Sequence, residues 1–132
     1  MFYNGHTMLI MLHGPDTYRS RQQLKKMISE FKAKRDPSGL NLNIFNADKI
    51  DAAEMLEAMV ASPFLAEKRL TVLERLSESK KKDIWENLLE LIKNKKLPDT
   101  SVIIFWEDEI KLNSHPLFAT LAKQKFSQKF ET

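Results

Sequence analysis

The polar residues in "HGPDTYRSR", at residues 13–21, are the natural place to look for phosphate chemistry, because they follow the first apolar run of the chain. In α/β proteins the first strand-to-helix turn can bind phosphate through backbone amides at the helix N-terminus. A P-loop, G-x-x-x-x-G-K-[ST], needs two glycines so that the backbone curls around the phosphate, and a lysine for charge. Here Gly14 stands alone, Pro15 has no amide hydrogen, and neither Gly-Lys-Ser nor a G-x-G-x-x-G fingerprint is present. Arg19 and Arg21 could meet a phosphate, but solvated arginines on a helix face are commoner. The sequence therefore predicts no nucleotide at this turn.

The other reactive side chains are spread too widely to predict a catalytic or metal site. His6, His13 and His115 lack ligand spacing. Asp16 and Asp48 each follow a predicted strand, which loosely resembles the acidic pocket of a phosphoacceptor domain, although helix capping and turn formation explain them better. No nucleophile stands with a base. We therefore expect no cofactor, no metal and no intrinsic catalysis from these residues.

Apolar runs and helical periodicity alternate along the chain, which predicts the order β-α-β-α-β-α-β-α-β. Strands are predicted at residues 8–12, 40–45, 69–73, 101–106 and 126–131, and helices within 15–35, 51–61, 79–96 and 114–124. Strict alternation with buried central strands predicts an α/β fold, with a mostly parallel five-stranded sheet and helices on both faces.

Capping residues support three of these helices. Asp16 or Thr17 can cap the first, and Asp51, with an acidic residue three positions later, predicts a capping box at the second. Ser114 is expected to cap the last helix, where Pro116 is tolerated in the first turn.

Composition sets broad limits on the class of protein. With 132 residues, of which 42% are hydrophobic and 30% charged, we expect residues 1–132 to form one globular domain with a real core. The absence of cysteine excludes disulfides and thiolate metal sites and fits a reducing compartment. No stretch approaches the length of a membrane span, so we expect no membrane contact and a cytoplasmic location.

The formal net charge of +3 is spread evenly along the chain, which argues against a dedicated nucleic-acid binder. Lysines cluster at 80–82 and 93–96, but acidic residues intersperse them. A solvated helix face is the expected role of both groups, so any DNA contact should be weak or indirect.

The stretch "ASPFLAEKRLTVL", residues 61–73, places an apolar Pro63-Phe64-Leu65 sequence between a predicted helix and a predicted strand, where a connector is normally polar. Two interpretations stand against each other. The side chains project and meet a partner, or Phe64 folds back over the edge of the sheet and Leu65 packs under the next strand. The residues by themselves leave both open.

Three stretches of the chain resemble the N-terminal domain of the delta subunit of bacterial DNA polymerase III, the clamp-loader subunit that opens the sliding clamp. They are an apolar strand running into "LHGPDTYRSR", the segment "ASPFLAEKRLTVLE", and "LPDTSVIIFWEDEIKLNSHPLFATL". Together they follow the family's order of strand, acidic helix start, Pro- or Leu-Phe connector, Arg-Leu strand and Leu-Phe-x-x-Leu helix. "SEFKAKRDPSGLN" and "HGP" are less typical of it.

The resemblance implies a RecA/AAA+-like nucleotide-binding fold without a functional P-loop, in a non-hydrolysing part of the DNA polymerase III holoenzyme. Family members carry later lid-like and collar domains that contact the other clamp-loader subunits. On this resemblance those domains would begin just past Thr132.

The resemblance also implies a site. In the family, the apolar residues after the second crossover helix insert into a hydrophobic pocket of the ring-shaped clamp, the beta subunit. By position, these residues are Ser62, Pro63, Phe64 and Leu65, with Met59 behind them on the helix. The resemblance thus predicts exposure of at least Phe64 or Leu65 and a role in clamp binding and opening. A degenerate nucleotide-binding or phosphoacceptor-like domain with no clamp role is the alternative.

Overall fold

The computed structural model describes residues 7–46, 49, 51–81, 83–110 and 114–132. Its strands are β1 (Met8–His13), β2 (Leu42–Asn46), β3 (Arg69–Glu74), β4 (Ser101–Trp106) and β5 (Gln128–Lys129). Its helices are α1 (Thr17–Lys34), α2 (Ala52–Val60), α3 (Asp83–Lys93) and α4 (Pro116–Ala122), with a 3₁₀ turn at Leu76–Glu78. The predicted alternation of strands and helices is confirmed.

The five strands form one sheet in the order β2-β3-β4-β1-β5, and every neighbouring pair is parallel. The inner strands are continuous apolar runs because a parallel sheet is covered on both faces. Ile104 of β4, for example, lies opposite Ile10 of β1 and Val72 of β3. The predicted α/β class is therefore confirmed.

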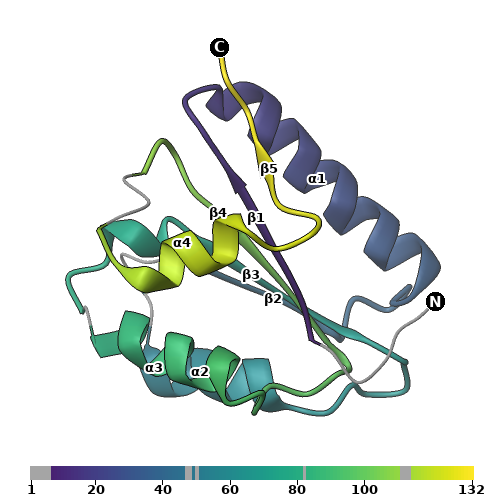
Figure 1. The fold of residues 1–132 in the computed structure, drawn as a ribbon. Coiled ribbons are helices and arrows are strands. Elements are labelled where there is room, and N and C mark those ends of the chain that lie inside the picture. The colour runs from purple at the N-terminus through teal and green to yellow at the C-terminus, as the bar shows by residue number, and fades with distance from the viewer. Residues whose placement is uncertain (1–6, 47–48, 50, 82, 111–113) are drawn as a thin grey trace.

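Crossover handedness decides which face each helix covers. The chain moves from β1 to the far edge at β2, and then returns step by step through β3 and β4 to β5. Because parallel crossovers are right-handed, the outward and returning connections place their helices on opposite faces. Figure 1 shows α1 on one side of the sheet and α2, α3 and α4 together on the other.

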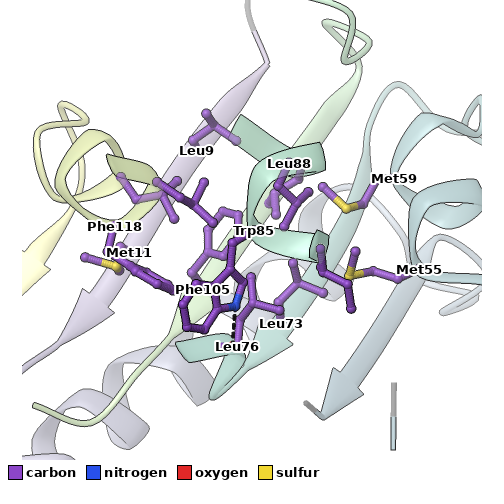
Figure 2. Close-up of a cluster of buried hydrophobic side chains, with 14 of the residues drawn as sticks. Leu9, Met11, Met55, Met59, Leu73, Leu76, Trp85, Leu88, Phe105 and Phe118 are labelled. Atoms are coloured by element: carbon purple, nitrogen blue, oxygen red, sulfur yellow. Dashed lines mark hydrogen bonds between the residues drawn. The ribbon is translucent and has the colours of Figure 1, made fainter. Parts of the chain in front are cut away.

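Each face has its own apolar core. On the side of α2–α4, Met59 and Met55 point from α2 toward α3 (Figure 2), and Trp85 of α3 and Phe105 of β4 belong to the same cluster. The Trp85 indole N–H donates to the Leu76 carbonyl over 2.9 Å, which satisfies its polar edge inside the core. On the other face, α1 contributes Leu24 and Phe31 to a second cluster.

Helix starts show where local prediction worked and where it did not. Asp16 caps α1 and Asp51 caps α2, as predicted. The prediction of Ser114 for the last helix is wrong: the N-cap is His115, whose Nδ1 accepts from the Leu117 N–H over 3.2 Å. An imidazole nitrogen can accept a hydrogen bond like a serine oxygen, so the cap moves one residue along.

The second long helix is shorter than predicted, because α3 begins at Asp83 rather than near residue 79. Leu76 turns into the core in the 3₁₀ turn, and Ser79 is extended, so a continuous helix cannot form there. His6, Asp48 and Lys82, which the sequence interpretation also named, lie outside the described residues.

Candidate functional site

The segment that connects α2 to β3 carries two neighbouring exposed apolar side chains, one of which, Leu65, is the most exposed large hydrophobic residue of the described chain. We call residues 62–65 the apolar tip. Phe64 is 57% exposed and Leu65 is 90% exposed. The alternative in which Phe64 folds over the sheet edge and Leu65 packs under a strand therefore does not hold. Among the large hydrophobic residues exposed in the described ranges, these two are the only sequence neighbours, the others being Tyr18, Leu40, Ile44, Val60 and Phe126.

The backbone at Leu65 is in the left-handed region, with φ of 52°. For a residue with a Cβ this conformation costs about 1–2 kcal/mol. Exposing the leucine side chain to water forgoes the further stabilisation that its burial would give. Leu65 thus meets two unfavourable terms without a compensating contact in the core, which is a pattern typical of functional surfaces.

Asn41, a buried residue just before β2, holds the backbone of the apolar tip. Its side-chain oxygen accepts from the Phe64 N–H over 2.6 Å, and its side-chain amide donates to the Phe64 carbonyl over 2.8 Å. The two bonds satisfy both backbone groups of Phe64 through one side chain. The tip is therefore exposed in its side chains but fixed in its backbone.

Asp36 in turn fixes Asn41. One carboxylate oxygen accepts from the Asn41 backbone N–H over 2.8 Å and the other from its side-chain amide over 3.1 Å. Burial by itself would raise the pKa of Asp36, but hydrogen bonds from Asn41, Ser38 and Leu40 outweigh it and hold the pKa below its ordinary value. The carboxylate therefore stays ionised as an acceptor at neutral pH.

Contacts on both sides anchor the ends of the connector. The Met59 carbonyl accepts from the Ser101 hydroxyl over 3.2 Å, which satisfies a carbonyl near the end of α2. At the other end the Arg69 N–H donates to the Thr100 carbonyl, and its guanidinium donates to Asn43 Oδ1 over 2.9 Å. Both ends are thus tied to the sheet.

The positions of the five residues predicted for the site divide into two groups. Ser62, Phe64 and Leu65 are exposed and Pro63 is half-buried, so these four share the surface of the tip. Met59 is 0% exposed and belongs to the core (Figure 2). Its buried side chain offers no surface to a partner.

At the first strand-to-helix turn, the chain itself occupies the hydrogen-bonding groups. The Gly14 N–H donates to the Asp108 carbonyl, the Asp16 N–H donates to the Phe130 carbonyl over 3.0 Å, and the Arg19 N–H donates to the Asp16 carboxylate. Gly14 has φ of 119°, and a Cβ there would collide with the Phe130 backbone. The segment after β5 therefore lies against the turn at which a P-loop protein would hold phosphate.

The remaining titratable candidates are engaged within the fold. His13 is buried, and burial together with the charge of Lys129 lowers its pKa. His115 caps α4 and lies edge-on to Trp85, with ring centroids 5.7 Å apart. Within the described ranges, no three His, Asp or Glu side chains gather to hold a metal ion.

Glu107, which the sequence interpretation passed over, is the most perturbed titratable group described. Burial raises its pKa to about 7, against the opposing effect of hydrogen bonds from Ser77. The Ser77 hydroxyl donates to the Glu107 carboxylate over 2.5 Å. The carboxyl group of Glu107, directly after β4, is thus hydrogen-bonded to the neighbouring turn at Ser77.

Sequence reasoning also missed Asp36 and Asn41. Residues 36–39 separate the first predicted helix from the strand predicted at 40–45, and nothing local shows that Asn41, in that predicted strand, reaches Phe64. An Asp and an Asn flanking a Pro-Ser-Gly turn are the only signal that the sequence offers.

Comparison with known families gives a match over residues 11–130 to the model described as "DNA polymerase III, delta subunit". The chain belongs to this family. The resemblance first inferred from three stretches is therefore confirmed over most of the chain's length.

Solved structures agree with the family on the fold. This delta-family chain is similar to the DNA clamp loader delta protein of Bacillus subtilis, with 17% identity and a TM-score of 0.71 over 95% of this chain and 39% of that one. It is also similar to a gamma subunit-related protein of DNA polymerase III from Thermotoga maritima, with 11% identity and a TM-score of 0.61 over 98% of this chain and 42% of that one. The predicted AAA+-like α/β fold is confirmed. No curated protein sequence matches.

The delta-family chain thus spans about two fifths of the length of these two solved proteins. None of its described helices is both long and apolar enough to cross a membrane.

Proposed function

We propose that this clamp-loader delta-type chain binds the ring-shaped sliding clamp through the apolar tip and biases the ring toward its open state. The observation that carries the proposal is the exposure of Phe64 and Leu65 on a backbone that Asn41 holds in place. Membership in the delta family supports it, since it places the chain in DNA replication. The solved relative from Bacillus subtilis is itself described as a clamp loader protein.

The tip has the chemistry of a small binding hot spot. Burying a phenylalanine or leucine side chain contributes about 1.5–3 kcal/mol each, so Phe64 and Leu65 could supply most of a modest interface. Pro63 and the bonds from Asn41 limit the conformations open to the free tip. Less conformational entropy is then lost when the tip enters a pocket.

Ring opening follows only if the chain prefers one state of the clamp. A ligand shifts an equilibrium by its differential affinity for the two states. The tip would therefore have to fit a clamp pocket better in the open ring than in the closed ring. Contacts with other clamp-loader subunits, which we assign to parts of the protein outside these residues, would decide when the tip is presented.

The location and a DNA role remain parts of the same proposal. A replication factor of this family would act in the cytoplasm of a bacterium. The described lysines at 80, 81, 93, 95 and 96 are exposed, and acidic residues lie between the two groups. We therefore expect only weak or indirect DNA contact from these residues.

Titration of a bacterial sliding clamp with the chain and with Phe64→Ala tests the proposal. Loss of a central aromatic anchor should weaken binding by about 2 kcal/mol or more, close to 30-fold in Kd. The variant should keep the melting temperature of the parent, because Phe64 packs little against its own domain.

Phe126→Ala is the matched control, since Phe126 is 48% exposed but lies in the turn between α4 and β5. Its affinity for the clamp should stay within about twofold of the parent. Equal affinities for the parent and a folded Phe64→Ala variant would reject the apolar tip as the binding site.

A further inference from the structure

The network around Asn41 joins three parts of the fold that are far apart in sequence. Its side chain contacts Phe64, 23 residues away, and its backbone carbonyl accepts from the Leu70 N–H at the start of β3 over 2.8 Å. Its partner Asp36 donates its own N–H to the Phe31 carbonyl at the end of α1. The tip backbone is thus linked to the end of α1 and to the sheet through one buried amide.

The polar groups of this network are matched one to one. Phe64 presents an N–H and a carbonyl, and the amide oxygen and nitrogen of Asn41 meet them in the one orientation that satisfies both. The same nitrogen also donates to Asp36, so this orientation is held from both sides. Rotation of the Asn41 amide would leave buried donors and acceptors unpaired, which is costly.

We propose that Asn41 is the positioning residue of the apolar tip: it holds the Phe64 backbone in the conformation that binds, and Asp36 fixes its orientation. This inference goes beyond the proposed function, and its binding half rests on that function. Asn41 itself is buried, so its side chain is out of reach of a partner. It acts by keeping the free tip in the binding-competent state, so its loss lowers the population of that state.

The first experiment measures hydrogen exchange of the Phe64 amide by NMR in the free chain, and so needs no clamp. Asn41→Ala should raise this exchange rate about 10-fold, as expected for one lost hydrogen bond of ordinary strength. Amides of β1 and β4 should keep their protection. Asn43→Ala is the matched control. Asn43 lies two residues after Asn41, and its replacement removes the hydrogen bond that Asn43 accepts from Arg69 while leaving the tip bonds intact.

The second experiment measures clamp association and dissociation rates by surface plasmon resonance. A positioning residue changes the fraction of competent tips, so Asn41→Ala should lower the association rate about 5- to 10-fold and leave dissociation nearly unchanged. Phe64→Ala removes a contact and should instead raise the dissociation rate. A purely structural role for Asn41 would lower the melting temperature without this split.

Asp36→Asn keeps the tip bonds but weakens the support of Asn41, and it serves if Asn41→Ala does not fold. It should raise the exchange rate of the Phe64 amide about threefold.

Unchanged exchange of the Phe64 amide in the folded variants, or an equal rise in Asn43→Ala, overturns the inference. If Asn41→Ala exchanges its Phe64 amide faster but associates with the clamp at the parent's rate, the part of the inference that concerns binding is overturned. If Phe64→Ala binds the clamp normally, the proposed function and this binding half fail, and the exchange result still decides whether Asn41 holds the tip.

Discussion

The two ends of the parallel sheet treat their connecting segments in opposite ways. At the amino ends of the strands, the apolar tip leaves the side chains of Phe64 and Leu65 in water, while Asn41 hydrogen-bonds the Phe64 backbone. At the carboxyl ends, the turn after β1 donates its amides to the Asp108 and Phe130 carbonyls. The tip at the amino ends thus has a hydrogen-bonded backbone and exposed side chains. The turn at the carboxyl ends has its backbone amides hydrogen-bonded to other segments of the chain.

The difference indicates where this fold can bind something. A ligand needs groups that the protein has not already satisfied, and the turn after β1 has few such groups because the segment around Phe130 lies on it. The tip presents apolar surface that only a partner can bury. The comparison therefore favours a protein partner at the amino edge over an anion at the carboxyl edge, although this edge is where α/β folds usually bind ligands.

The largest effect is expected at Gly14, where replacement tests how closely the two segments of the carboxyl edge pack. Gly14→Ala should lower the free energy of unfolding by about 3 kcal/mol, because the new methyl group collides with the Phe130 backbone at a positive φ. Urea denaturation measures the change.

Gly39→Ala is the control, since Gly39 also has a positive φ but its Cβ would meet only Lys32 at an ordinary distance of 3.9 Å. It should cost about 1 kcal/mol, the conformational term by itself. Equal losses in the two variants would show that the segment around Phe130 does not press on the turn.

An effect that reaches the size of that at Gly14 only at low pH is expected from Glu107, another polar group of the carboxyl edge that is hydrogen-bonded within the chain. Its pKa is raised from 4.5 to about 7 in the folded chain, so the folded state binds the proton more tightly than the unfolded state. Stability should then rise as the pH falls from about 7 toward 4.5, by about 3 kcal/mol at most. Denaturant unfolding across this range measures it.

Glu107→Gln removes the titrating group and keeps an oxygen that can accept from Ser77. Its stability should be flatter between pH 4.5 and 7 than that of the parent. If the parent and variant curves run parallel, Glu107 is not the group that titrates there.

The smallest effect is expected at Leu65, where one substitution should stabilise the fold and weaken clamp binding. Leu65→Asn should raise the free energy of unfolding by up to about 1 kcal/mol, because asparagine tolerates the left-handed backbone and the leucine is exposed. The same change should weaken clamp binding by about 1–2 kcal/mol through loss of buried apolar area. Thermal unfolding and clamp titration measure the two quantities. If Leu65→Asn binds the clamp as tightly as the parent, Leu65 does not contribute to binding and Phe64 is the main contact of the tip.

Much of the fold was predictable because its signals are local. The apolar runs at β1 and β4, the periodicity of α1, and the capping aspartates at 16 and 51 depend on neighbouring residues only. The cap at His115 and the late start of α3 were not predicted, because tertiary packing of Leu76 and the imidazole decided between near-equal local choices.

By itself, the sequence determined the alternation of strands and helices, the lack of a P-loop pattern and the place of the apolar tip in the chain. It left open whether Phe64 and Leu65 face water or the core, and an Asp and an Asn around a turn were too weak a signal to predict that Asn41 reaches Phe64. These points were decided by which distant segments meet once the sheet has formed. Local periodicity fixes the face that a residue presents within its own element, whereas contacts between residues 23 or more positions apart depend on the register and crossover of whole elements.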